Sequence, residues 1–386
     1  AVAINPITKI ALVTQPGISQ VAKIDLSDLA KLPQFFTVSS GLVGVAVDVN
    51  LNWAVLTNPG GNTVSILDLN PATPVELPPL AVGTQPIGVA VDSTLHLAVV
   101  ANRGSGTVSI VDLTRLAVTA TLAVGSEPLG VDINPHTHVA AVTNNLTGTL
   151  TLVDLNSQTV LGNPLAVAAQ PGAVALHPAT NVAVAADAVA GTVTRVDVGD
   201  TATFKNFTLS FISPHSTAPS GGSGGSLDIR ANGTGYQSSN NVAYGDLPLS
   251  STLANAGRLV GTLPFTAFSA VSAEAVTVVD TGTNRRTNAV GFRVEKSVAV
   301  GRGPTGIAVN PHSQLGIVVN GLESNASVLD LVTGIVRSTI SLQASSSPAG
   351  VTINPFNNVA VITLAARNQA AVVDLITASQ ISTINV

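Results

Sequence analysis

Short apolar runs of four to seven residues, separated by turn-forming clusters, recur along this chain. The stretch at 84–125 holds four of them, GVAV, LAVVA, TVSIVDL and VTATLAV. Runs of this length that are rich in Val, Ala, Leu and Ile suit strands buried on both faces. The pattern therefore predicts an all-β chain built from a unit of four strands.

The four-stranded unit repeats at a nearly constant interval. Alignment on the Asp that closes the third strand of each copy gives Asp25, Asp68, Asp112, Asp154, Asp197, Asp330 and Asp374. The successive intervals are 43, 44, 42, 43, 133 and 44 residues, so one interval is much longer than the rest. A single sheet of this size cannot close a core, whereas several sheets packed around an axis can. We predict a seven-bladed β-propeller with an inserted domain.

The second and third strands of the unit carry a family resemblance. Residues 54–58 read Ala-Val-Leu-Thr-Asn, and residues 63–68 read Thr-Val-Ser-Ile-Leu-Asp. These segments resemble the YVTN propeller repeats, whose second strand ends in a Thr-Asn-like pair and whose third strand reads V-x-V-I-D. Gln15, Asp187 and Leu364 depart from that pattern, and no copy has the tyrosine. The departures weaken a shared site and leave the expected fold intact.

The long interval has a different character. It contains Ile-Ser-Pro at 212–214, Gly-x-Gly-Tyr at 233–236, Ser-Ser-Thr-Leu at 250–253 and Asn-Ala-Val-x-Phe-x-Val at 288–294. This order resembles an IPT/TIG-type immunoglobulin-like domain, and recurring period-2 strands favour a β-sandwich over a disordered linker.

The fourth strands place this insertion within the fifth blade. The ending Leu-Ala-Val-Gly at 80–83 and 122–125 returns as Val-Ala-Val-Gly at 298–301, after the long interval. We therefore predict blades 1–4 and three strands of blade 5 in 1–198, the Ig-like domain in 199–293, and the last strand of blade 5 with blades 6–7 in 294–386.

Composition restricts which partners and which cellular locations we expect for this chain. Apolar residues make up 45% of the chain, yet no run approaches the roughly 18 to 20 residues of a membrane-spanning helix. The net charge is −5 with no basic run, which argues against nucleic-acid binding. The chain has no cysteine and does not begin with Met. We expect a monomer that is secreted, periplasmic or at the cell surface.

Candidate binding residues lie in the connections that line a propeller's axial funnel. Polar side chains are expected around this rim at Gln85, Arg103, Glu127, Gln170, Asp187, Arg302 and Arg367. Gln85, Glu127, Gln170 and Arg302 are expected at equivalent points. Such a ring could hold a small polar ligand or a segment of a partner protein. Alternatively, these loops are polar because they are solvated, and their strand-end residues satisfy local backbone groups.

Other chemistry has little support in the sequence. The turns on the opposite face hold His96, His136, His138, His177 and His312. These histidines are spread over four blades, so we predict solvated side chains and neither a metal site nor a cofactor. A G-x-S-x-G nucleophile motif is absent. Glu127 with Asp187 is the one carboxylate pair worth testing, and we assign no catalytic residue.

The sequence favours a non-catalytic, exported or cell-surface propeller that serves as a protein-binding, ligand-binding or structural module. The alternative is a propeller enzyme of the lactonase, lyase or quinoprotein kind, with its site in the axial funnel.

Overall fold

The computed structural model describes residues 1–39, 41–71, 73–178, 180–198, 294–331 and 333–386, and eight strands between residues 209 and 288. The chain forms two compact units. One joins Ala1–Val196 with Val294–Val386, and the other comprises Asp197–Arg293.

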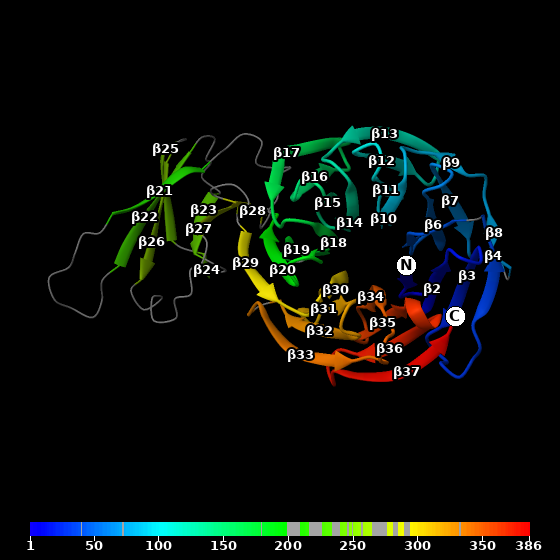
Figure 1. The fold of residues 1–386 in the computed structure, drawn as a ribbon. Coiled ribbons are helices and arrows are strands. Elements are labelled where there is room, and N and C mark those ends of the chain that lie inside the picture. The colour runs from blue at the N-terminus through cyan, green and yellow to red at the C-terminus, as the bar shows by residue number, and fades with distance from the viewer. Residues whose placement is uncertain are drawn as a thin grey trace. The chain divides into compact units, whose positions relative to one another are not determined.

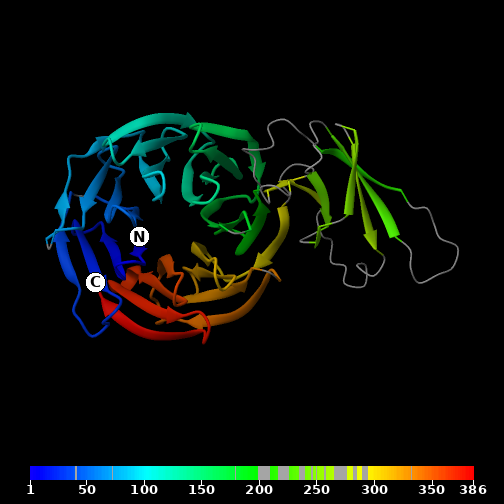
Figure 2. The same ribbon diagram turned by 180° about the vertical axis from the view of Figure 1, so that it is seen from behind.

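The larger unit is a seven-bladed β-propeller, as predicted. Figure 1 shows its sheets arranged in a ring around a central axis, and Figure 2 shows the same ring from behind. Within each blade the strands pair antiparallel in chain order, from the innermost outwards.

Equivalent strands have similar bounds in all seven blades. The first, innermost strands are β1 (Val2–Asn5), β5 (Val45–Asp48), β10 (Pro86–Asp92), β14 (Pro128–Asn134), β18 (Pro171–His177), β30 (Pro304–Asn310) and β34 (Pro348–Asn354). The second strands are β2 (Ile10–Gln15), β6 (Trp53–Asn58), β11 (Leu97–Asn102), β15 (Val139–Asn144), β19 (Val182–Asp187), β31 (Leu315–Asn320) and β35 (Val359–Leu364). The third strands are β3 (Gln20–Asp25), β7 (Thr63–Asp68), β12 (Thr107–Asp112), β16 (Thr149–Asp154), β20 (Thr192–Asp197), β32 (Asn325–Asp330) and β36 (Gln369–Asp374).

The outermost strands vary more than the others. They are β4 (Gln34–Thr37), β8 (Val75–Glu76) with β9 (Leu80–Ala81), β13 (Ala117–Ala123), β17 (Thr159–Ala166), β29 (Val294–Ala299), β33 (Ile335–Ser341) and β37 (Ser379–Asn385). In blade 2 this strand is split, and both pieces pair with β7. In blade 5, β29 pairs with β20, so the chain completes this sheet after residues 197–293.

Burial along the strands explains the apolar runs. Every residue of β11 is buried, because this second strand packs against a neighbouring blade on each side. By contrast, exposed and partly buried residues alternate along the outermost strand β13. Continuous apolar sequence therefore belongs to the middle of a blade, and period-2 alternation belongs to its outer edge.

The hydrophobic core lies between blades. One buried cluster joins Val55 and Ile66 of blade 2 to Val100 of blade 3. Another joins Val2 and Ile4 of blade 1 to Val361 and Val372 of blade 7 and closes the ring. Each sheet thus depends on its neighbours for burial, which is why a single unit cannot fold alone.

Glycines on the innermost strands permit close approach between blades. A Cβ atom on Gly44 would collide with the Ile87 carbonyl oxygen, and one on Gly88 would collide with the carbonyl oxygen of Leu129. Since both obstacles are backbone atoms of the next blade, a side chain there would push two blades apart. These glycines therefore let the backbones of neighbouring blades approach closely.

In its described residues, the smaller unit has eight strands in two four-stranded sheets. One sheet has the order β21 (Leu209–His215), β22 (Ser226–Gly233), β26 (Arg258–Pro264) and β25 (Ser250–Asn255). The other has the order β24 (Leu247–Pro248), β23 (Asn240–Tyr244), β27 (Val276–Asp280) and β28 (Arg285–Asn288). The predicted Gly-x-Gly-Tyr and Asn-Ala-Val-x-Phe-x-Val motifs fall largely outside the described residues.

Helical structure in the described part of the chain is slight. It includes the 3-10 turn η2 (Ala365–Arg367). None of the helices there has the length and apolarity to cross a membrane.

The two ends of the propeller are named by their connections. The upper face carries the connections from fourth to first strands and from second to third strands. The lower face carries the other two sets. The rim residues of the sequence-based prediction belong to the upper face.

Candidate functional site

The upper half of the central channel is a cavity of about 450 Å³. Each blade contributes one aliphatic side chain to it at the same register of its innermost strand. These residues are Val2, Val45, Val89, Val131, Val174, Ile307 and Val351. Glycine backbone and further aliphatic residues such as Ile87 and Leu129 complete most of the wall. A cavity with this wall offers dispersion contacts and a dry surface to a ligand.

Threonine hydroxyls donate hydrogen bonds to backbone carbonyls around this cavity. The Thr14 hydroxyl donates to the carbonyl of Val43 in the next blade at 2.8 Å. Thr57 donates to Ile87 at 2.8 Å, and Thr143 makes the same bond to Gly172. Thr305, which itself lines the cavity, donates to Pro348 at 2.9 Å. These bonds tie blades together and remove polar acceptors from the wall, so its apolar character is strengthened.

Three neighbouring blades expose an aliphatic side chain on the upper face. Leu146, Val189 and Leu322 stand two residues after the end of the second strand in blades 4, 5 and 6, and they are 68%, 70% and 72% exposed. Leu322 lies against Gly303, and the adjacent Gly321 approaches the side chain of Thr305 on the channel wall. The apolar surface of blade 6 therefore runs from the rim to the cavity.

The structure brings two of the predicted rim residues together. A guanidinium nitrogen of Arg103 in blade 3 lies 2.9 Å from a carboxylate oxygen of Glu127, at the start of blade 4. Both side chains are more than a third exposed. An exposed pair of this kind stabilises a fold by less than about 1 kcal/mol, so its charges remain accessible to a ligand.

Asp187 has a structural role. Its side chain is buried, and its carboxylate accepts hydrogen bonds from the amides of Val189 and Ala190 in its own turn. It also accepts one from Ala169 in the connection before the first strand. Glu127 and Asp187 thus bind different partners. The proposed carboxylate pair has no support in these contacts.

The asparagines at the ends of the second strands also have a structural role. The Asn102 side-chain amide donates to the hydroxyls of Thr107 and Ser109, and that of Asn144 does so to Thr149 and Thr151. Asn320 likewise contacts Ser327. These residues join the second strand to the third, so the Asn of the repeat supports the blade itself.

The remaining predicted rim residues are separate from one another. Gln85 and Glu127 occupy the same left-handed position of the turn, with φ values of 52° and 53°. Arg302 is displaced by one position, because Gly303 takes the place of Gln85. Gln170 is exposed at the start of blade 5, and Arg367 donates to the carbonyl of Ala344. The structure therefore brings together only Arg103 and Glu127 among the predicted rim side chains.

The lower face is built from polar pairs that cross between blades. The last residue of an innermost strand reaches a residue in the next blade's turn, as Asn5 does with Asn52 at 2.9 Å and Asn310 with Asn358 at 2.8 Å. Asn134 makes the same contact with Asn181. We call these contacts the lower clasps. They connect side chain to side chain, unlike the threonine bonds above.

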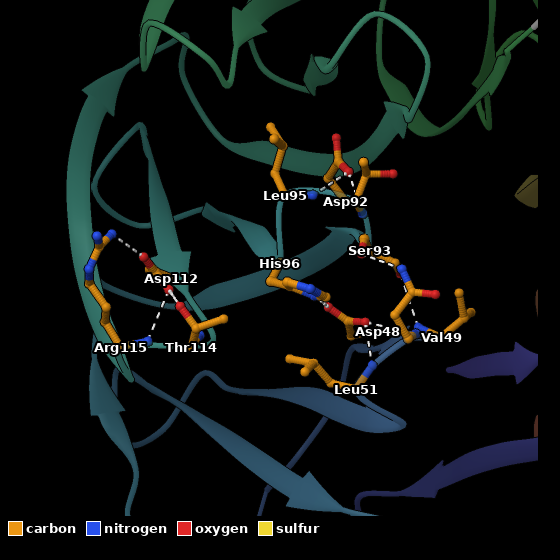
Figure 3. Close-up of polar contacts among 12 residues, drawn as sticks. Asp48, Val49, Leu51, Asp92, Ser93, Leu95, His96, Asp112, Thr114 and Arg115 are labelled. Carbon is orange, nitrogen blue, oxygen red and sulfur yellow. Dashed lines mark hydrogen bonds and ion pairs between the residues drawn. The ribbon is translucent and has the colours of Figure 1, made fainter.

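Two lower clasps pair an aspartate with a histidine. Asp48 is fully buried, and one of its oxygens lies 2.8 Å from His96 Nδ1 while the other caps the Asn50 and Leu51 amides (Figure 3). Asp92 and His138 repeat the arrangement at 2.7 Å. The prediction of solvated turn histidines is therefore wrong for His96 and His138, because each satisfies a buried carboxylate of the preceding blade.

The sequence contains a signal for these clasps. Partners are separated by 46 to 48 residues, which is one repeat plus the four-residue step across the turn. A search for polar pairs at this interval would have identified them.

Two other polar side chains on the innermost strands, His177 and Asp132, have pKa values that burial shifts. His177 is 1% exposed, its Nδ1 accepts a hydrogen bond from the Thr180 amide, and its Nε2 has no partner. Burial lowers its pKa. The prediction of a solvated side chain is therefore wrong for His177 as well. Burial also raises the pKa of Asp132 to about 6, although the Leu176 amide of the next blade donates to its carboxylate at 2.7 Å.

Turns after the third strands use the aspartates that define the repeat. Asp112 accepts hydrogen bonds from the Thr114 and Arg115 amides and lies 2.6 Å from the Arg115 guanidinium (Figure 3). Burial opposes its ionisation, but the hydrogen bonds outweigh burial and hold its pKa below the usual value. The alignment Asp is thus a turn cap.

Among the described residues, no group of three or more His, Asp or Glu side chains is placed to hold a metal ion. Comparison with protein-family models and with curated proteins found no match.

Solved structures share the fold. One is hydrazine synthase from Kuenenia stuttgartiensis, with a TM-score of 0.57 and 13% identity over 100% of this chain and 94% of that chain. Another is a functionally unknown protein from Desulfotomaculum acetoxidans DSM 771, with a TM-score of 0.63 and 10% identity over 97% of this chain and 95% of that chain. At these identities the likeness shows the propeller fold and carries no assignment of activity.

Proposed function

We propose that this chain is a non-catalytic, exported or cell-surface binding module whose ligand sits at the upper mouth of the propeller. The observation that carries the proposal is the cavity of about 450 Å³, whose lining side chains are aliphatic apart from Thr305. Such a surface can hold a partner, and its one side-chain hydroxyl, that of Thr305, donates to the Pro348 carbonyl with no acid or base among the other lining side chains. The exposed Leu146, Val189 and Leu322 extend the surface to the rim.

We further propose that the repeats belong to the YVTN type and that residues 199–293 form an IPT/TIG-like, Ig-fold domain. The shared hydrogen bonding of Asn102, Asn144 and Asn320 supports a common repeat. The two four-stranded sheets of Asp197–Arg293 support a β-rich insert, which would act as a second interaction unit or a spacer.

Paired variants on the two faces test the binding proposal. The full chain would be screened against peptides and small molecules by thermal shift and native mass spectrometry. Ligands should lose binding to the Leu146→Asp/Leu322→Asp variant and retain binding to Ile7→Asp/Phe356→Asp, which changes exposed lower-face residues. Ligands that depend only on the lower-face pair would overturn the proposal.

An enzyme of the lactonase, lyase or quinoprotein kind is the alternative. The exposed Arg103–Glu127 pair is the one charged constellation at the rim that favours it. Turnover of a candidate substrate that falls at least tenfold in Glu127→Gln, with unchanged thermal stability, would establish this alternative. Elemental analysis and an absorbance spectrum of the protein from its native host would reveal a metal or a coloured cofactor.

A further inference from the structure

We infer that the upper half of the channel binds an uncharged, apolar small molecule. This inference rests on the proposed function, because it names the ligand class of the same site. Its basis is the aliphatic wall of the cavity together with the cavity's volume.

The wall selects against polar ligands. A polar molecule that enters the cavity gives up hydrogen bonds to water and must replace them. The threonine bonds to Val43, Ile87, Gly172 and Pro348 already occupy carbonyls that could have accepted from it. An apolar molecule loses no hydrogen bonds on entry and gains contact with one aliphatic side chain from every blade.

The volume suits a small molecule. About 450 Å³ lies within the roughly 300 to 1,000 Å³ typical of small-molecule sites. The exposed Leu322 rim, continuous with the wall through Gly321 and Thr305, offers a further contact to the part of the molecule nearest the mouth.

Most of the charged side chains at the rim are balanced by a charge of the opposite sign. Arg103 is matched by Glu127, and Arg367 donates to a backbone carbonyl. In blade 6, Arg302 and Glu323 add one exposed charge of each sign. These five side chains carry three positive charges and two negative ones, so the charge at the mouth is a small positive excess that contributes little to the choice of ligand.

The test uses the neutral fluorescent probe N-phenyl-1-naphthylamine and the full chain. Saturable binding with a fluorescence increase is expected. Leu129→Asn places a polar group of similar size on the wall and should weaken binding about tenfold or more. Ile87→Trp fills the cavity and should abolish binding. Leu116→Asn is the matched control, because Leu116 lies in an outer turn with φ 52°, which Asn tolerates, and binding should not change.

The possible outcomes separate this inference from the proposed function. Loss in both cavity variants with retention in Leu116→Asn supports it, with thermal melts verifying the fold. If Leu129→Asn fails to fold, Ile87→Trp decides. Absence of saturable binding, or equal binding by the folded cavity variants, overturns the inference. If the screen still yields ligands that depend on Leu146 and Leu322, the apolar-ligand inference fails and the binding module stands. If neither probe nor screen detects binding, both fail.

Discussion

Neighbouring blades are joined by different kinds of hydrogen bond at the two ends of the propeller. At the lower end, blades are joined by pairs of polar side chains, including the buried carboxylates of Asp48 and Asp92. At the upper end, threonine hydroxyls bond to backbone carbonyls, and the channel wall remains aliphatic. The lower end therefore joins blades through polar side chains, whereas the wall of the proposed ligand site at the upper end is aliphatic.

This contrast reverses an intuitive expectation about function. Histidine and aspartate are the residues usually suspected of chemistry, but here they satisfy each other between blades. The cavity proposed as the ligand site is lined almost wholly by aliphatic residues and glycine. Each prediction below tests one part of this comparison, beginning with the largest expected effect.

The lower clasps should tolerate replacement of both paired residues by another polar pair, but not the removal of one partner. Asp48→Ala should destabilise the fold by about 3 kcal/mol, because His96 and two turn amides lose their acceptor in a buried site. The stability of the double variant Asp48→Asn/His96→Asn should remain within about 1 kcal/mol of the wild type, because both partners are replaced together and neither is left unpaired. This variant recreates the Asn5–Asn52 pair, and residues 96 and 52 share a φ of 55°.

Urea denaturation measures both variants. A double variant as unstable as Asp48→Ala would show that the Asp–His pair itself is required, and that the clasps are not interchangeable.

The upper channel should be sensitive to a single methyl group at selected glycines. Gly88→Ala should cost about 2 kcal/mol, because its Cβ would collide with the carbonyl oxygen of Leu129 in the next blade. Gly350→Ala is the control. Its Cβ would lie 3.4 Å from the Thr363 hydroxyl and 3.5 Å from Ala1 Cα, which is ordinary van der Waals contact. Chemical denaturation should separate the two variants, and equal stabilities would contradict the proposed packing of the innermost strands.

Asp132 lies on the same strand as channel-wall residue Val131 and clasp residue Asn134, and it should make stability depend on pH. Its folded pKa of about 6 lies above the reference value of 3.8, so between these values the folded state binds more protons. Stability from this group is therefore greatest below about pH 4 and falls as pH rises to about 6. Asp132→Asn retains an acceptor for the Leu176 amide and should stabilise the fold by about 2 kcal/mol at pH 8.

The pH effect is measured as a difference between two proteins. Denaturation of the wild type and Asp132→Asn at pH 4 and pH 8 should show an advantage of the variant that is present at pH 8 and lost at pH 4. An advantage that is constant with pH would assign the effect to packing and not to ionisation.

Much of the scaffold could be predicted from the sequence, and the site could not. The repeated Asp at the end of the third strand predicted the seven blades, and in described copies such as Asp68, Asp112 and Asp374 it caps the turn that follows. Asp187 shows the limit of such reasoning. It was predicted as a rim ligand, but its carboxylate faces backbone amides, and only the turn geometry reveals that orientation.

The sequence by itself determined the blade count, the strand pattern and the small residues of the innermost strands, because periodicity and local turn chemistry repeat every 42 to 44 residues. Tertiary structure alone decided which polar groups meet. Asp48 and His96 lie on different blades, and their pairing depends on how two sheets pack. The apolar cavity likewise exists only because seven innermost strands, each unremarkable in sequence, converge on one axis.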